Sequence, residues 1–284
     1  MATAILNGRR AWRPRSAVPG LGLTLGGTLT ILSLVVLIPL AAVAARALSL
    51  SPETFVRVAF SPRAVHAYEL SLGAALVAAG INALMGIVTA WVLVRYRFPG
   101  RRLLDALVDL PFALPTAVAG ISLATLYGPN GWLGAPLARA GITVANTVVG
   151  IVVALTFIGL PFVVRTVEPV LRDLAADVEE ASASLGATRL QTLARVVAPA
   201  LAPAWITGFS LAFARGVGEY GSVIFIAGNM PYRSEITPLL ITMELEQFDY
   251  AAASAIALVM LGLSFSLLLV VNATQAWMRR STLP

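Results

Sequence analysis

The chain has no cysteine, no lysine and a single histidine among its 284 residues. The absence of cysteine excludes disulfides, thiolate metal sites and a cysteine nucleophile. The absence of lysine excludes the G-x-x-x-x-G-K-[ST] loop with which P-loop ATPases hold phosphate groups. The lone His66 has no carboxylates at metal-ligand spacing around it, so we predict no metal site and no cofactor.

Charged residues are also scarce. Only 12% of the residues are charged, whereas soluble domains carry about 25%. Hydrophobic residues make up 58% and the mean hydropathy is +0.85, which excludes a single large water-facing globule. A net charge of +6 could suggest a nucleic-acid partner, but the arginines flank apolar runs. We therefore interpret them as signals of membrane topology and predict no nucleic-acid binding.

The apolar runs predict an all-α, polytopic membrane protein with six transmembrane helices. A helix needs about 20 apolar residues to cross the bilayer core. Four runs carry no charge, a fifth extends backward past Asp105 and Asp109, and a sixth is interrupted by Arg215 and Glu219. In chain order the expected spans are residues 21–45, 70–94, 103–127, 141–164, 200–227 and 250–278. We expect a tail at 1–20 and a transmembrane domain at 21–280.

The first apolar run resembles a signal peptide because four arginines precede it. Its 25 uncharged residues are too long for a signal h-region, and no clear small-residue cleavage site follows. We therefore expect it to remain as a span.

The arginines are distributed unequally between alternate loops. One side would hold 14 of them, at positions 9, 10, 13, 15, 95, 97, 101, 102, 165, 172, 189, 195, 279 and 280. The other side would hold five, at positions 46, 57, 63, 139 and 233. Because positive charge accumulates in cytoplasmic loops, both termini and the loop between spans four and five are expected in the cytoplasm.

That loop, residues 170–199, is the one long, charged and amphipathic stretch. An apolar stripe at helical spacing predicts one amphipathic helix, through Leu171, Leu174, Val178, Ala181 and Leu185. Gly186 stands where a left-handed C-cap would end this helix. Thr188 and Gln191 have the spacing of a capping box that would start a second helix. Pro199 suits the first turn of span five.

Amphipathicity alone leaves two interpretations of this loop. It could be an interfacial hairpin without a partner, or a surface that docks another protein. The spacing of its small and charged residues favours docking. Glu180-Ala181-Ser182, then Gly186, then Val196 to Pro199 resembles the EAA loop of importer-type ABC permeases. Serine, valine and alanine replace the family's alanine, isoleucine and leucine at positions 182, 196 and 198.

The resemblance implies that this loop docks a cytoplasmic ATPase. Glu180, Ala181, Gly186 and Pro199 would then be the ATPase-coupling residues. A channel working alone would not need such a loop, and a membrane enzyme would need a nucleophile with a base or clustered carboxylates. His66 falls in a loop and intramembrane acidic residues are few, so we expect no catalytic residues.

Four further runs narrow the family. They are 111–120 (PFALPTAVAG), 159–167 (GLPFVVRTV), 218–229 (GEYGSVIFIAGN) and 247–253 (QFDYAAA). Together they are most similar to the T-type permeases of sulfate/thiosulfate ABC transporters, over residues 21–280. The alternative is a permease for molybdate or another tetrahedral oxyanion.

This resemblance implies a type I importer in a bacterial inner membrane. The partners would be a homologous W-type permease, two ATP-binding subunits that hydrolyse ATP, a periplasmic sulfate- or thiosulfate-binding protein, and membrane lipid. The permease itself would have no ATPase site.

Arg215 and Glu219 are charged residues within an expected span, where each costs at least about 2.5–3.5 kcal/mol. They are four residues apart and therefore share a helix face, close enough to pair. They could line the pathway near its cytoplasmic half, with Arg215 available to an oxyanion. They could instead be a neutralised pair that fixes span five to its neighbours. We favour the second interpretation, because a strong anion site inside a conduit would trap its substrate.

Two other features have open interpretations. Pro111, Pro115 and Pro161 are expected to kink their helices, as part of a gate or of ordinary packing. The outer loop 228–249 carries Arg233, Glu235, Glu244, Glu246 and Asp249, and could contact a delivery protein or form a re-entrant segment.

Overall fold

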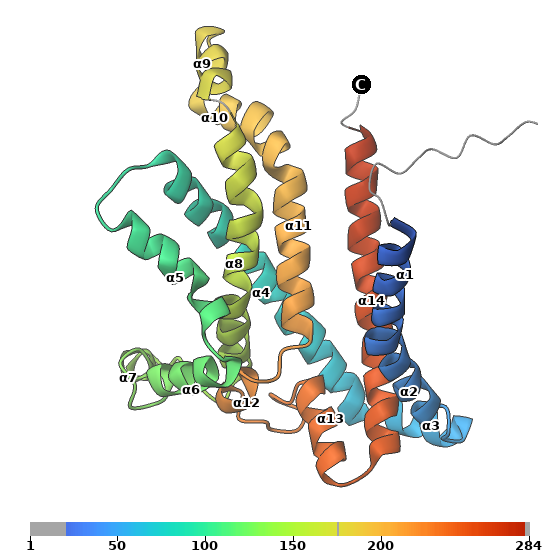
Figure 1. The fold of residues 1–284 in the computed structure, drawn as a ribbon. Helices are drawn as coiled ribbons and strands as arrows, with labels where there is room; N and C mark the ends of the chain where they lie inside the picture. Colours follow the sequence, from blue (N-terminus) through green and yellow to red (C-terminus); the bar gives the residue numbers. More distant parts are fainter. Residues whose placement is uncertain (1–20, 175, 282–284) are drawn as a thin grey trace, which may run out of the picture.

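A computed structural model describes residues 21–174 and 176–281, and this part of the chain is helical with no strand (Figure 1). The expected tail, residues 1–20, lies outside the described residues. Five helical segments are long and apolar enough to span a membrane, at Gly22–Ala47, Pro62–Arg95, Val148–Asp173, Arg189–Val217 and Tyr250–Ala273. A sixth span is possible as a bent pair, Arg101–Ala113 with Thr116–Tyr127.

The spans correspond to named helices. They are α1 (Leu21–Leu32) with α2 (Ile38–Ala47), α4 (Pro62–Arg95), α5 (Arg101–Ala113) with α6 (Thr116–Tyr127), α8 (Val148–Asp173), α10 (Arg189–Thr192) with α11 (Ala198–Val217), and α14 (Tyr250–Ser281). Shorter helices lie between them: α3 (Pro52–Ala59), α7 (Gly134–Arg139), α9 (Ala176–Ser184), α12 (Val223–Ile226) and α13 (Thr237–Glu246).

The third span differs from the expected single helix. α5 and α6 meet at an angle of 115° (Figure 1). Leu114, which precedes Pro115, adopts an extended ψ of 134° because proline disfavours helical geometry in the residue before it. Pro111 and Pro161, by contrast, lie inside helices that continue past them. The structure therefore has a full break between α5 and α6 at Pro115, where the sequence predicted a kink.

The fifth span begins and ends earlier than expected. It runs from Arg189 to Val217, so Pro199 lies well inside a continuous helix and not at its start. A π-helical turn, Leu193–Val197, ends two residues before this proline, and the N–H of Ala198 donates to the carbonyl of Leu193. In a π-helical turn an N–H donates to the carbonyl five residues before it and not four. The hydrogen bonds are therefore shifted by one residue just before Pro199, which has no N–H to donate. Pro39 follows the π turn Ser33–Leu37 in the same way.

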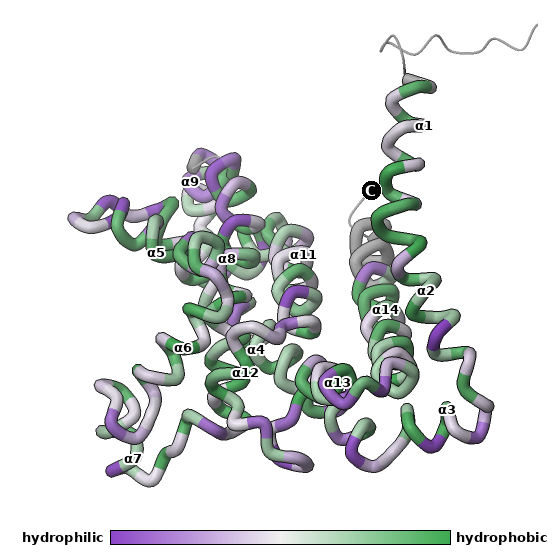
Figure 2. The backbone as a smooth tube through the Cα atoms, turned by 60° about the horizontal axis from the view of Figure 1, so that its bottom comes forward, coloured by the Kyte–Doolittle hydropathy of each residue, from purple (hydrophilic) through white to green (hydrophobic). Residues whose placement is uncertain are grey.

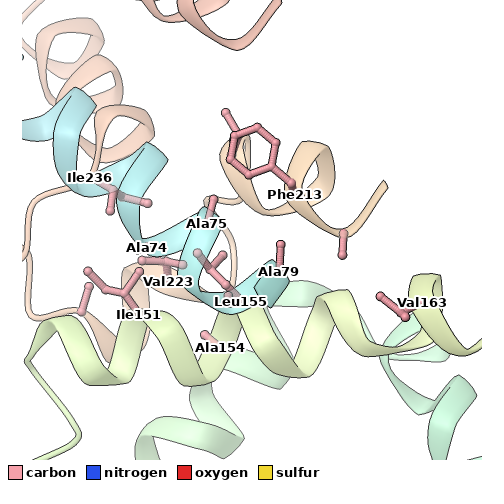
Figure 3. Packing of buried hydrophobic residues seen from close by; sticks show 14 of the residues in the cluster. Ala74, Ala75, Ala79, Ile151, Ala154, Leu155, Val163, Phe213, Val223 and Ile236 are labelled. Atoms are coloured by element: carbon pink, nitrogen blue, oxygen red, sulfur yellow. The ribbon is translucent and has the colours of Figure 1, made fainter. Parts of the chain in front are cut away.

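The core is built from α4, α8 and α11, which approach closely through small residues (Figure 3). α4 contributes buried alanines, among them Ala74, Ala75 and Ala79, against Ile151 and Leu155 of α8. Without a hydrophobic driving force between helices in lipid, close packing of this kind supplies much of the association.

Two glycines lie close to Val163 where α4, α8 and α11 cross. A Cβ on Gly86 of α4 would lie 2.6 Å from the Cγ1 of Val163, and a Cβ on Gly208 of α11 would lie 2.8 Å from its Cα. Glycine at both positions therefore lets α4 and α11 close on α8 from two sides.

A second, smaller group of helices consists of α1, α2, α3 and α14. Ala47, Ala59 and Ala255 form its buried centre. The apolar side chains of α1 and α2 face outward, with Leu23 86% exposed, and Figure 2 shows α1 and α2 as mainly hydrophobic. Apolar faces of this length suit contact with lipid.

Candidate functional site

The helix pair α9 and α10 lies at one end of the molecule, where α10 is the first turn of the long segment that continues into α11 (Figure 1). α9 ends in a Schellman turn, in which Ala187 N–H donates to Ser182 O (3.1 Å) and Gly186 N–H donates to Ala183 O (2.9 Å). Gly186 has φ +83°, which confirms the predicted left-handed C-cap. A Cβ there would meet no atom within 4 Å, so the glycine is required by backbone conformation and not by space.

The second helix begins with the predicted capping box. Thr188 Oγ1 accepts from Gln191 N–H at 3.3 Å, and the Gln191 side chain accepts from Thr188 N–H at 2.8 Å. Ser182 bonds Thr192 at 2.8 Å between their hydroxyls, so the two helices are tied together. Ser182 is one of the three positions at which the chain departs from the EAA loop pattern, and its hydroxyl forms this tie.

The prediction of one amphipathic helix through Leu171, Leu174, Val178, Ala181 and Leu185 is wrong. Leu171 is fully buried in α8, and the chain bends at Leu174, whose ψ is 103°. The part of 170–199 outside the long helices is therefore residues 174–188, and the stripe is divided between α8 and α9.

The divided stripe leaves an uncovered surface. Glu180 and Ala181 are exposed, Leu185 is 90% exposed and Leu190 is 74% exposed. Figure 2 shows mainly hydrophilic residues along α9, in contrast to the mainly hydrophobic residues along α1.

Glu179, the neighbour of the candidate Glu180, fixes α9 to the rest of the chain. Its carboxylate pairs with Arg95, in the last turn of α4, at 2.5 Å. Arg95 also donates to the carbonyl of Leu174, at 3.2 Å. No local pattern in the sequence indicates this pair, because its partners are 84 residues apart.

Arg165 of α8 is the centre of a second set of ion pairs that the sequence analysis did not identify. It contacts Asp105 and Asp109 of α5 at 2.7 Å each, and Glu168 at 2.5 Å. Glu168, buried, also pairs with Arg172. The sequence signal for this cluster was the spacing of its charged residues, which are three or four positions apart within each helix. The cluster joins α5 to α8 and holds three carboxylates against two arginines.

The expected ion pair between Arg215 and Glu219 forms, at 2.5 Å. Glu219 is not within the span, however, because α11 ends at Val217. Its other carboxylate oxygen accepts from the N–H and the hydroxyl of Ser222, at 2.9 and 3.0 Å. The Glu219 side chain is 2% exposed and that of Arg215 is 34% exposed. The carboxylate therefore organises the turn into α12.

The depth expected for this pair is wrong. Arg215 lies at the opposite end of the span from α9 and α10, about 39 Å from Arg189 at 1.5 Å per residue. It is therefore not in the half of the molecule nearest to α9 and α10.

The segment after α12 is anchored by Glu235. Its carboxylate pairs with Arg63 at 2.6 Å and is buried, so Glu235 is not available to a delivery protein. Burial, with the nearby Asp249 carboxylate, raises the pKa of Glu244 on α13. The exposed side chains here include those of Tyr232, Arg233, Glu246, Phe248 and Asp249.

Within residues 21–174 and 176–281, no group of three or more histidine, cysteine or acidic side chains is placed to hold a metal ion. His66 instead lies with its ring 6.2 Å from that of Tyr232.

Residues 82–283 match the family described as the binding-protein-dependent transport system inner membrane component. The chain belongs to this family. It is therefore a transport subunit that crosses the inner membrane several times.

Among characterised relatives, the chain is 50% identical over 262 residues to the sulfate transport system permease protein CysT of Salmonella typhimurium, covering 92% of this chain and 95% of that protein. It is 49% identical over 262 residues to CysT of Escherichia coli K12, with the same coverage. It is 49% identical over 253 residues to CysT of Synechocystis, covering 89% and 88%.

Two solved structures define the fold. A bacterial ABC transporter that imports alginate matches with a TM-score of 0.73 and 16% identity, covering 93% of this chain and 96% of that one. The MetNI methionine ABC transporter matches with a TM-score of 0.56 and 17% identity, covering 83% and 100%. The fold is that of a type I ABC importer permease, as the sequence predicted.

Proposed function

We propose that this chain is the T-type permease subunit of an ABC importer that moves sulfate or thiosulfate across the inner membrane. The observation that carries the proposal is 49–50% identity to sulfate permeases over 92% of the chain. The region aligned with these permeases includes the helices that would form the pathway.

ATP hydrolysis would occur in separate subunits that dock on α9 and α10. The exposed Leu185 and Leu190 offer apolar contacts, and Ala181 is small enough to let α9 enter a groove of the ATPase. Glu180 lies beside it, exposed and free to accept hydrogen bonds from the partner. Gly186 sets the angle between α9 and α10, and Pro199 with its π turn shapes the helix behind them.

The arginine distribution supports an orientation in which α9, α10 and both termini are cytoplasmic. A W-type permease would complete the pathway, and a periplasmic sulfate- or thiosulfate-binding protein would approach the end with α7, α12 and α13. Reporter fusions after Arg57, Arg97, Arg139, Arg189 and Arg280 should report outside, inside, outside, inside and inside. An outside report at Arg189 would contradict docking of a cytoplasmic ATPase.

We assign Arg215 and Glu219 a bracing function and not a substrate site. Glu219 is buried and already accepts three hydrogen bonds from protein donors. An anion approaching Arg215 would also meet this carboxylate.

The experiment that tests the substrate uses cells that lack their own T-type permease but retain the other subunits. Expression of this chain should restore uptake of radiolabelled sulfate, and excess thiosulfate should compete with it more effectively than molybdate does. Restored molybdate uptake without sulfate uptake would contradict the assignment.

A further inference from the structure

An open groove of about 1120 Å³ lies at the end of the molecule that carries α9 and α10. One wall is the C-terminal part of α4, and the other is the π turn with the start of α11. The loop after α4 and the α9–α10 pair close it at one end. The transport model above does not use this groove.

The deeper part of the groove is apolar. Ile87, Val88 and Trp91 line it from α4, and Leu193, Val197 and Leu201 line it from the opposite wall. From Ile87 to the end of α4 the groove follows the helix for about 12 Å, at 1.5 Å per residue. This part lies within helices apolar enough to span a membrane, so a hydrocarbon chain suits it.

The rim of the groove is basic. Arg97 and Arg189 line it, and Arg101 and Arg102 border the adjoining hollow beside Phe98. None of these four arginines takes part in an ion pair within residues 21–174 and 176–281. The one carboxylate at the rim, Glu179, is already paired with Arg95.

We propose that this groove, which we call the α4–α11 groove, binds an anionic phospholipid. Its phosphate would lie between Arg97 and Arg189, and one acyl chain would lie against Trp91 and Leu201. The groove has arginines without ion-pair partners among the described residues at one end and a continuous apolar wall at the other. An anionic phospholipid has a negatively charged headgroup and a hydrocarbon chain, so its two ends match the two ends of the groove. Free inorganic phosphate would satisfy only the rim, and an apolar helix of another protein would leave the arginines unpaired.

Bound there, the lipid would connect α4 to α9 and α10, the elements that carry the proposed ATPase contact. This inference does not depend on the identity of the transported anion, since the groove is at the opposite end of the span from Arg215.

Native mass spectrometry of the purified complex provides the test. The complex is exchanged into phosphatidylcholine nanodiscs that contain a minor fraction of phosphatidylglycerol, and the lipids retained per complex are counted. We expect the wild-type complex to retain phosphatidylglycerol preferentially. The double variant Arg97→Gln, Arg189→Gln should bind it roughly 30-fold more weakly, the conversion of about 1 kcal/mol per surface arginine at 1.4 kcal/mol per tenfold.

Two matched variants separate the site from general charge effects. Arg57→Gln, Arg139→Gln removes two exposed arginines from the other end of the molecule, neither of which forms an ion pair with the described residues. This double variant should leave retention unchanged. Val88→Trp fills the apolar wall while keeping every arginine, and should also reduce retention.

Several outcomes would overturn the proposal. They are equal retention of the two lipids by the wild-type complex, equal loss in the Arg57, Arg139 control, retention unaffected by Val88→Trp, and full displacement by inorganic phosphate. A complex in which the second permease covers the groove and excludes lipid would also overturn it.

Discussion

Arg95 and Glu179 join the last turn of α4 to the middle of α9 through an ion pair of 2.5 Å. Both side chains are partly exposed, at 21% and 30%, and Arg95 also bonds the carbonyl at the bend before α9. This pair orients the surface on which we propose that the ATPase docks.

Breaking the pair should loosen α9 without unfolding the spans. Partly exposed pairs contribute about 0.2–1 kcal/mol, so Glu179→Gln should weaken binding of the ATP-binding subunit by at most about fivefold. The exchange Arg95→Glu, Glu179→Arg should recover part of the loss. Titration of the ATP-binding subunit onto the immobilised permease measures this, and an exchange variant no better than the single variants would contradict the role.

The turn at Gly186 should tolerate asparagine but not leucine, although the two side chains are similar in size. Positive φ costs most L-residues about 1–2 kcal/mol, whereas asparagine adopts it readily. Gly186→Leu should release or uncouple the ATPase while the spans remain inserted, and Gly186→Asn should retain co-purification and uptake. Equal behaviour of the two variants would show that backbone conformation at 186 is not the cause.

Loss of the Glu219 carboxylate should destabilise the protein more than it alters transport. Removing one partner of a buried charge pair costs about 3–5 kcal/mol. Glu219→Ala should therefore lower the thermal unfolding midpoint of the complex sharply, and Ser222→Ala should lower it less, because one hydroxyl donor is lost. A Glu219→Gln complex of normal stability that hydrolyses ATP without response to sulfate would instead place Glu219 in the pathway.

Close packing at Val163 predicts that alanine is tolerated differently at Gly208, inside α11, and at Gly218, the C-cap of α11. Gly208→Ala would bring a Cβ within 2.8 Å of backbone, whereas Gly218→Ala would meet nothing within 4 Å. Overpacking costs about 1–3 kcal/mol, so the first variant should lose stability and the second should not. Thermal unfolding of both in the same detergent checks this, and equal midpoints would contradict the packing argument.

Local patterns predicted the local structure of the α9–α10 pair. Gly186 and the Thr188–Gln191 box depend on residues within a few positions of each other, and both appear as expected. The ion pairs of Arg95 and Arg63 could not be predicted, because their partners are 84 and 172 residues away and only the helix packing brings them together. The sequence predicted a kink at Pro115 but could not show that the helix would break there, since Pro161 is accommodated inside a continuous helix.

The most direct measurement is sulfate accumulation in proteoliposomes that contain this chain with a W-type permease, two ATP-binding subunits and the sulfate-binding protein. The account predicts uptake that requires ATP on the side of α9 and α10, and that Gly186→Leu abolishes while Gly186→Asn preserves. Sulfate accumulation without ATP, or with ATP but unaffected by omission of the ATP-binding subunits, would contradict it.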